Sequence, residues 1–315
     1  MNVHANTLMS GLTADALPVA PGLEVATTGG PVGTVVRGVD LAADVRPDII
    51  FSLLAIFNHS GLMIVPGQER LTPDRQAQIA RWFGPSFVRG QMEGKRDQLP
   101  MTENPLVQLL SNRDQKAAGL KPVEDKNGAA TQPLGIHSDV QDYDAPPDVT
   151  ILHGAIIPPP SAGGNTYFGN LYMAYDDLSP ELKQRLDGAK WRPHSTYKTM
   201  RGVQQKEAMV NPEADRDSSV LHPVARTHPV TGRKALWVSS FTEEVVGDWS
   251  REEGGALAKQ LFEHVAQPKY WYTHIWIPHD VLFWDNRCVN HRRDSWDNNY
   301  VREMHRAQAG GSLPF

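Results

Sequence analysis

The chain has 315 residues, of which 40% are hydrophobic and 21% are charged, so it can bury a sizeable core and is not globally disordered. The net charge of -5 argues against a general nucleic-acid binder, and the single cysteine, Cys288, excludes an internal disulfide framework. No apolar run reaches the roughly 18 residues that span a bilayer, and the N-terminus lacks a secretory signal, so we expect a cytoplasmic protein without a membrane or nucleic-acid partner.

The first third of the chain alternates between expected strands and helices, after a loose lead-in over residues 1 to about 20. These elements are short strands around a turn over 23–39, a helix over 47–57, a buried strand over 61–65 and a helix over 72–83. The second helix has the clearest start, because Thr72 is a good N-cap and Pro73 suits the first helical position.

Residues 86–135 lose this periodicity, apart from an expected strand over 106–110. The segment is polar and rich in Gly and Lys. Long irregular segments of compact domains are usually functional or solvated. A lid over the residues that follow and a solvated insertion are equally compatible with this pattern.

The second half of the chain is dominated by short apolar runs that are separated by Pro and Gly. Strands are expected over 150–157, 166–168, 191–200, 270–276, 281–284 and 300–309, with a hairpin turn over 228–233 and a loop over 204–219. Helices are expected over 252–266 and over 172–186, the latter with a second start at Ser179-Pro180-Glu181. This pattern predicts a mostly β fold with flanking helices, a double-stranded β-helix (a cupin-like jelly roll), in a single domain over 1–315.

A histidine and an aspartate, His137 and Asp139, flank Ser138 in the middle of the chain. Positions i and i+2 of a strand share one face, so the imidazole and the carboxylate point to the same place. They make two-thirds of a 2-His-1-carboxylate facial triad, which is typical of non-haem Fe(II) oxygenases. Taken alone, this short pattern is more often two unrelated polar residues in a surface loop, so the metal-site interpretation needs a second histidine further along the chain.

A second histidine, His291, follows a predicted buried strand 152 positions after Asp139. Only the fold can bring these residues together. The alternative is a surface histidine in a charged loop, next to Arg292 and Arg293.

Several further motifs accompany these residues in a fixed order. They are Gly163-Gly164-Asn165-Thr166, the 222–233 stretch that ends in Thr231-Gly232-Arg233, Trp284-Asp285-Asn286-Arg287, and Arg302-Glu303-Met304-His305-Arg306. With the two histidines and the aspartate, they resemble the taurine dioxygenase-like (TauD/TfdA) family of Fe(II)- and 2-oxoglutarate-dependent oxygenases. The resemblance runs from about residue 35 to residue 309.

The resemblance implies a role for each motif residue. His137, Asp139 and His291 bind Fe(II), while 2-oxoglutarate and O2 are the cosubstrates. Thr166 hydrogen-bonds the distal carboxylate of 2-oxoglutarate. Arg302 and Arg306 follow His291 by 11 and 15 positions, and their spacing puts both on one strand face. One of the two holds 2-oxoglutarate, and the other lies near the anionic end of the primary substrate.

The expected reaction is oxidation of a C–H bond in a small anionic substrate, a carboxylate or a sulfonate, with release of succinate and CO2. Hydroxylation is expected, followed for some substrates by bond cleavage or desaturation. Halogenation is not expected, because halogenating relatives have a small residue in place of Asp139. Two segments, 85–91 and 133–134, lack the polar contacts of the taurine enzyme, which argues against taurine itself.

Substrate contacts are expected from Arg306 and Phe241, the latter matching an active-site aromatic of the family. Secondary candidates are the cations Arg89, Lys198, His59 and Arg201 and the aromatic residues Tyr143, Tyr197 and Trp191. A homo-oligomer, dimer or tetramer, is also expected. Two other functions use similar residues: a non-catalytic jelly-roll binding protein, and a Zn(II) hydrolase with the same His/Asp/His set.

Overall fold

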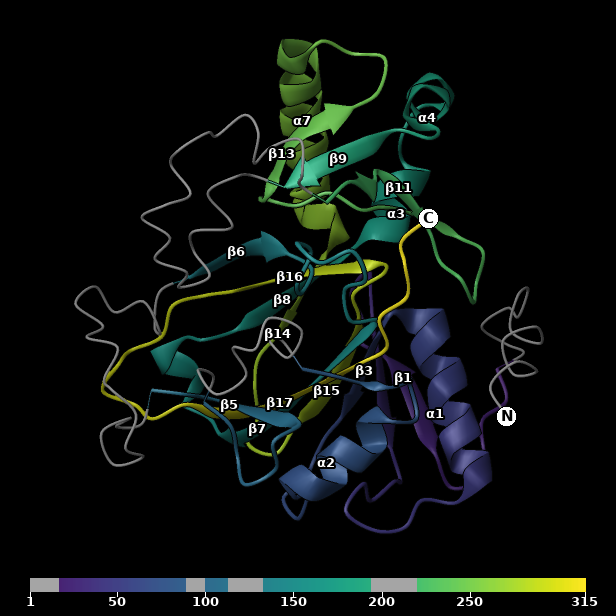
Figure 1. Cartoon of the computed structure of the whole chain (residues 1–315). Coiled ribbons are helices and arrows are strands. Elements are labelled where there is room, and N and C mark those ends of the chain that lie inside the picture. The colour runs from purple at the N-terminus through teal and green to yellow at the C-terminus, as the bar shows by residue number, and fades with distance from the viewer. Residues whose placement is uncertain (1–16, 89–99, 113–132, 194–219) are drawn as a thin grey trace.

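The computed structural model describes residues 17–88, 100–112, 133–193 and 220–315 (Figure 1). Its centre is a large β-sheet in the order β1-β2-β3-β15-β7-β17-β4, with β5 also paired to β17. The strands are Glu24–Thr27 (β1), Thr34–Arg37 (β2), Leu62–Val65 (β3), Val281–Asp285 (β15), Val149–Ile156 (β7), Glu303–Ala309 (β17), Ser86–Phe87 (β4) and Val107–Ser111 (β5). Neighbours pair antiparallel, except for the parallel pair β2 and β3.

A second, four-stranded sheet has the order β14-β8-β16-β6. Its strands are Trp271–His274 (β14), Thr166–Asn170 (β8), Val289–Arg293 (β16) and Leu134–His137 (β6). Two smaller sheets combine Lys190–Pro193 (β9), His222–Pro223 (β10) and Thr242–Val246 (β13), and Ala225–Thr227 (β11) with Lys234–Leu236 (β12). This is the expected mostly β jelly roll.

Helices cover the outside of these sheets. They are the α-helices Pro47–Ser60 (α1), Pro73–Ala80 (α2), Leu171–Asp176 (α3), Pro180–Leu186 (α4) and Arg251–Val265 (α7), and the 3-10 helices Pro160–Ala162 (η4) and Pro268–Tyr270 (η5). In Figure 1, α1 and α2 lie against the large sheet, whereas α7 lies beside β13 and β9. Within the described ranges, no helix combines the length and the apolar character that crossing a membrane requires.

The central strands β7 and β15 of the large sheet are buried on both faces, and their side chains alternate between two cores. Along β7, Leu152 belongs to the core on the side of the second sheet, whereas Ile151 belongs to the core under α1 and α2. The neighbouring strand repeats this alternation with Leu282 and Phe283. Because successive side chains of a strand point to opposite faces, alternate residues of β7 face the functional site, and the residues between them pack against the helices.

Most expected elements are present, and the differences have local causes. Thr72 caps α2 as expected by accepting a hydrogen bond from the backbone of Arg75, but this helix already ends at Ala80. The stretch expected to be helical over 172–186 forms two helices, and the second begins at the expected start, where Ser179 caps Pro180. Strand β16 was not expected. The loop expected over 204–219, and the strand expected over 191–200 beyond residue 193, lie outside the described residues.

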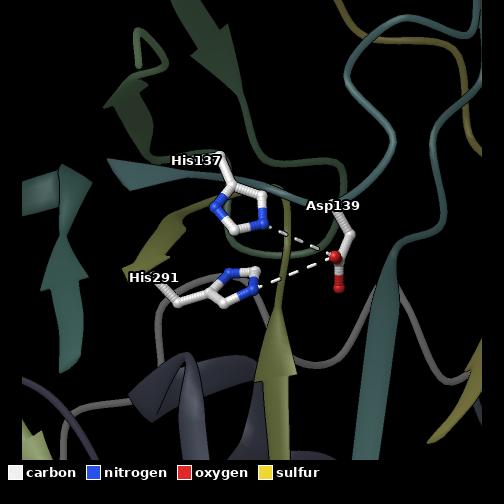
Figure 2. Close-up of side chains that lie close together, drawn as sticks. All are labelled: His137, Asp139 and His291. Carbon is white, nitrogen blue, oxygen red and sulfur yellow. Dashed lines mark ion pairs between the residues drawn. The ribbon is translucent and has the colours of Figure 1, made fainter. Parts of the chain in front are cut away.

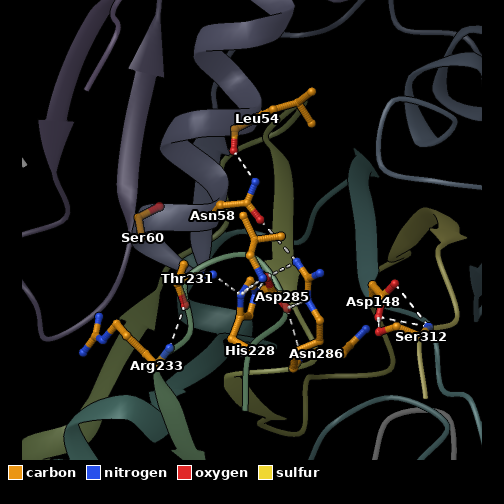
Figure 3. Close-up of polar contacts among 12 residues, drawn as sticks. Leu54, Asn58, Ser60, Asp148, His228, Thr231, Arg233, Asp285, Asn286 and Ser312 are labelled. Carbon is orange, nitrogen blue, oxygen red and sulfur yellow. Dashed lines mark hydrogen bonds and ion pairs between the residues drawn. The ribbon is translucent and has the colours of Figure 1, made fainter. Parts of the chain in front are cut away.

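A buried charge network joins the end of β15 to the turn after β11 (Figure 3). Arg287 donates to both carboxylate oxygens of Asp285, at 2.8 and 2.6 Å, and His228 Nε2 lies 2.9 Å from the same carboxylate. His228 Nδ1 accepts from the backbone of Val230 and Thr231, so its proton is on Nε2. Burial alone would raise the pKa of Asp285, but the charge of Arg287 and the contact with His228 lower it strongly. The carboxylate is therefore ionised and anchors both segments.

Asp285→Asn should destabilise the protein by about 3–5 kcal/mol, because it leaves the buried Arg287 guanidinium without its counter-charge. Urea unfolding at pH 7 measures this loss. Asp48→Asn is the matched control, since Asp48 pairs with Arg46 in an exposed ion pair on α1. Equal unfolding midpoints for the two variants would contradict the anchoring role of Asp285.

Candidate metal centre and active site

Three side chains from distant parts of the chain converge between the sheets (Figure 2). His137 ends β6, Asp139 follows it closely, and His291 lies in the middle of β16, directly opposite His137 in the strand register. The Nε2 atoms of His137 and His291 lie 3.9 and 3.8 Å from Asp139 Oδ1, and the two ring centroids are 4.2 Å apart. All three residues are buried, so the alternative of a surface loop is wrong for this triad.

A hydrogen bond and burial set the protonation of the triad residues. His137 Nδ1 lies 2.7 Å from the carbonyl oxygen of Gly135, so the ring proton points there and the Nε2 lone pair points to Asp139. Burial lowers the pKa of both histidines, that of His291 to about 3. Burial would raise the pKa of Asp139, but the neighbouring histidines, Arg306 and Thr150 bring it to about 2.

Two neutral imidazoles and one carboxylate therefore meet in this buried space at neutral pH. Their separations are too long for hydrogen bonds. One ligand atom from each residue lies within 4.8 Å of the other two, which fits a single cation. Two histidines and one carboxylate are the donor set of the facial triad.

Asp139 is fixed by a hydroxyl on β7 and by a side-chain amide directly after β15. Thr150 on β7 donates to Asp139 Oδ2 at 2.6 Å, which leaves Oδ1 for the histidine side. The Thr150 oxygen accepts from the side-chain amides of Asn286 and Gln308, each at 3.0 Å. Asn286 also accepts from the backbone N–H of Asp139 at 3.2 Å. These contacts orient a carboxylate ligand from behind.

The strand argument for His137 and Asp139 holds only in part. Strand β6 ends at His137, and Asp139 lies in the following turn, where Val140 has a φ of 55°. The two side chains converge because the Asn286 contact holds the turn, rather than through strand alternation. Ser138 points away from the triad and is buried, with its hydroxyl 2.8 Å from Asn290 Oδ1.

A buried cluster of cations, which we call the cationic pocket, lies at one end of the second sheet around Arg302, Arg293 and Thr166. Arg302 is 4% exposed, and its guanidinium carbon lies 5.2 Å from the ring of Trp296 and 5.9 Å from that of Trp276. Trp276 Nε1 donates to Thr166 Oγ1 at 2.9 Å, so Thr166 and Arg302 share this indole. Burial lowers the pKa of Arg302 to about 9, helped by the charge of Arg293. The site therefore favours an anion.

Arg306 lies elsewhere, beside the triad. Its guanidinium is 3.4 Å from Asp139 Oδ1 and donates to Gln108 Oε1 at 2.6 Å. A small pocket opens next to it, with apolar side chains from β4, the residue after it and the segment before β5, and polar side chains from β5 and β17. Its lining consists of Phe87, Val88, Met101, Leu106, Gln108, Arg306 and Gln308. The expectation that Arg302 and Arg306 share a strand is wrong, because β17 begins at Glu303.

Sequence reasoning missed Arg293 at the cationic pocket. It lies directly opposite Thr166 in the register of β8 and β16, so the two side chains share a face. Its guanidinium carbon is 4.6 Å from the ring of Trp296, which Arg302 also contacts. Its position could have indicated this role, because Arg293 follows His291 by two residues and therefore lies on the same face of the strand as His291. It was overlooked because that segment was interpreted as a loop.

The remaining candidates divide into three groups. The Phe241 ring lies 5.9 Å from that of His137, so it borders the triad, and Tyr143 packs against Phe87 of the pocket at 5.8 Å. Trp191 is a core residue that packs on Trp237, and His59 is exposed on α1, so neither lines the site. Arg89, Lys198, Arg201, Tyr197 and most of the 86–135 segment lie outside the described residues.

A second buried group, His228, Asp285 and Cys288, also has ligand atoms within 4.8 Å of one another. Here both Asp285 oxygens accept from Arg287, and the His228 proton points at Asp285. Burial raises the pKa of Cys288, which keeps it a thiol. This group is a structural network and not a metal centre.

Comparisons with known proteins agree with this geometry. The family model of "Taurine catabolism dioxygenase TauD, TfdA family" matches residues 24–308. The (S)-phenoxypropionate/alpha-ketoglutarate dioxygenase of Sphingobium herbicidovorans is 28% identical over 93% of this chain and 96% of its own length. The alpha-ketoglutarate-dependent 2,4-dichlorophenoxyacetate dioxygenase of Cupriavidus pinatubonensis is 28% identical over 86% of this chain and 92% of its own length. The structure of AAD-2 with Mn(II) and N-oxalylglycine superposes with a TM-score of 0.73, at 25% identity over 93% of this chain and 98% of that one.

Thr150→Val should weaken the binding of a divalent transition-metal ion by about 10–100-fold, because Asp139 loses the hydroxyl that orients it. Thr150→Ser keeps that hydroxyl and should bind almost normally. Titration calorimetry of the metal-free protein with Mn(II) measures both affinities, and urea unfolding of each variant separates a loss of affinity from a loss of fold. Equal affinities for the Val and Ser variants would show that the hydroxyl does not position the carboxylate.

Proposed function

We propose that this chain, which belongs to the taurine catabolism dioxygenase TauD, TfdA family, oxidises a C–H bond of a small anionic carboxylate or sulfonate through its His137–Asp139–His291 triad. The chain is an Fe(II)- and 2-oxoglutarate-dependent dioxygenase. The convergence of three buried acceptor atoms within 4.8 Å supports the assignment of the ligands most directly.

The triad residues fit Fe(II) in number and in type. Two imidazole nitrogens and one carboxylate oxygen supply three ligands and leave other positions for small molecules. When bound, Fe(II) supplies the oxidation of a substrate C–H bond by O2, coupled to the conversion of 2-oxoglutarate to succinate and CO2. The chain's own part is to hold Asp139 through Thr150, to keep both imidazoles neutral and to exclude bulk water.

The distal carboxylate of 2-oxoglutarate fits the pocket of Thr166, Arg302 and Arg293. A hydroxyl and a guanidinium fork match a carboxylate. Both guanidiniums are in contact with the Trp296 ring, and burial lowers the pKa of Arg293 to about 10. The sequence does not decide whether Arg302 or Arg306 binds 2-oxoglutarate. These contacts make Arg302 the better candidate.

For the primary substrate, the position beside Arg306 is the better candidate. That pocket combines one guanidinium with apolar walls from Phe87, Met101 and Leu106. An anionic group near Arg306 and an apolar body against these walls describe a small aryl or alkyl carboxylate or sulfonate. The aryloxy acids named for the two similar dioxygenases have this character. Phe241 borders the other side of the triad, next to His137.

His137→Ala and Asp139→Ala should each abolish succinate formation while the fold survives, because each removes one of three metal ligands. Turnover is measured with 2-oxoglutarate, an aryloxy acid and either Fe(II) or Zn(II). Far-UV circular dichroism and the unfolding midpoint check the fold. Full Fe(II)-dependent turnover in either variant would refute the ligand assignment, and substrate hydrolysis with Zn(II) alone would favour a hydrolase.

Arg302→Ala should raise the KM for 2-oxoglutarate at least 30-fold, because loss of one partner of a buried charge pair costs roughly 2–5 kcal/mol. Arg293→Ala should raise it less. Arg292→Ala is the matched control, since its guanidinium lies on Tyr167 and pairs with Asp294. Steady-state succinate release measures each KM, and an Arg302 variant with a normal KM contradicts the cosubstrate pocket.

Arg306→Ala should raise the KM for an aryloxy acid more than that for 2-oxoglutarate, since its guanidinium borders the apolar pocket. Arg306→Lys retains a charge without the fork and should restore part of the loss. Succinate release at varied concentrations of each substrate measures the split. If only the 2-oxoglutarate KM rises, the roles of the two arginines are exchanged.

A further inference from the structure

A row of side chains crosses the large sheet, starting at the pocket beside Arg306. On β17, Gln308 is the direct partner of Phe87 on β4 and of Thr150 on β7. Thr150 is in turn the partner of Trp284 on β15. Direct partners of an antiparallel pair leave the sheet on the same face. The row therefore leads from a wall of that pocket, Phe87, to the core around the triad.

The Thr150 hydroxyl in this row has one proton and three polar neighbours. Asp139 Oδ2 lies 2.6 Å away, and the side-chain nitrogens of Asn286 and Gln308 each lie at 3.0 Å. An ionised carboxylate can only accept, so the hydroxyl donates to Asp139 and both amides donate to the hydroxyl. Asn286 is oriented independently, because its Oδ1 atom accepts from the indole N–H of Trp284 at 3.0 Å.

The two amide donors fix the direction of the Thr150 hydroxyl. A hydroxyl oxygen has two lone pairs, and Asn286 and Gln308 occupy both of them. Thr150 and Asn286 are 0% exposed and Gln308 is 5% exposed, so bulk water does not compete for these positions. The proton is therefore held on Asp139 Oδ2, which leaves Oδ1 for the metal. Loss of one amide donor frees a lone pair and lets the hydroxyl rotate.

Gln308 differs from Asn286 because it also borders the pocket beside Arg306. The pocket lining includes Gln308, Arg306 and Phe87. Arg306 lies two positions before Gln308 on β17, so both side chains leave the strand on the same face. One side chain therefore supports the metal centre on one side and borders the space proposed for the primary substrate on the other.

We propose that Gln308 is a positioning residue for the oxidation. Through the Thr150 hydroxyl it keeps Asp139 turned with Oδ1 toward the metal, and it also forms part of the substrate pocket. The inference rests on the proposed function, because it takes Asp139 as a metal ligand. It follows that the pocket cannot be reshaped at Gln308 without a loss of metal affinity.

The test is a double-mutant cycle on the metal-free full chain, in which titration calorimetry measures the affinity for Mn(II). Gln308→Met keeps the length of the side chain but removes the donor, and it should weaken Mn(II) binding about three- to tenfold. In the Thr150→Val background no hydroxyl is left to orient, so the same substitution should change the affinity by less than about twofold.

Steady-state succinate release gives a second reading. In the Gln308→Met variant, the Fe(II) concentration that gives the half-maximal rate should rise by the same factor as the Mn(II) dissociation constant. The KM for 2-oxoglutarate should stay normal, because the pocket proposed for its distal carboxylate lies around Arg302. A general loss of structure would change both quantities.

Two control variants separate this role from sheet rigidity and from pocket shape. Gln76 on α2 is also buried, and its amide donates to the carbonyl of Ile151, next to Thr150 on β7. Gln76→Met should lower the urea midpoint without changing the Mn(II) affinity. Phe87→Leu alters the pocket wall beside Gln308 and should also bind Mn(II) normally.

If Gln308→Met does not fold, Gln308→Leu takes its place with the same expected losses. The proposal is overturned if the Gln308 variant binds Mn(II) as tightly as the unsubstituted chain, or if its loss is equally large in the Thr150→Val background. An equal loss in Gln76→Met also overturns it, because sheet rigidity then explains the effect. An unsubstituted chain that binds no Mn(II) refutes the assignment of the metal ligands itself, and this inference with it.

Discussion

Three lone-pair donors that face one another in a buried space impose the main constraint on this structure. The Nε2 atoms of His137 and His291 each lie 3.8–3.9 Å from Asp139 Oδ1, too far for a hydrogen bond, so the three residues are stable neighbours only when the surrounding chain keeps them there or a cation joins them. The Thr150 hydroxyl and the Asn286 amide provide that support from the large sheet. The site therefore depends on residues from both sheets, and these residues hold the metal ligands in position without a bound metal.

The different roles of the two faces of the large sheet follow from the same constraint. Alternation along β7 and β17 places Thr150 and Arg306 toward the triad and His153 and His305 toward α1 and α2. The buried charged residues either stabilise the fold or serve the site. The Asp285–Arg287 pair anchors the end of β15. Arg302 lies near the indole rings of Trp296 and Trp276, where it can bind an anion. The sheet thus gives the centre its rigidity and its polarity together.

Much of this could be predicted from the sequence, for identifiable reasons. Apolar runs between Pro and Gly give most of the strands, and caps such as Thr72 give the helix starts. His137 and Asp139 stand out by spacing, but His291 is assigned only by resemblance, because no local pattern links residues 152 positions apart. Thr150, Asn286 and Arg293 were missed, since their roles arise from strand register. The contacts of Arg89 and Lys198 stay predictions, because those residues lie outside the described ranges.

The most direct measurement is a crystal structure of this chain with Mn(II) and N-oxalylglycine, the pair bound in AAD-2. The account predicts one ion coordinated by His137 Nε2, Asp139 Oδ1 and His291 Nε2, with Asp139 Oδ2 still bonded to Thr150. It also predicts that the distal carboxylate of N-oxalylglycine lies against Thr166 and Arg302. An ion bound without His291, or a distal carboxylate paired with Arg306 instead, would contradict it.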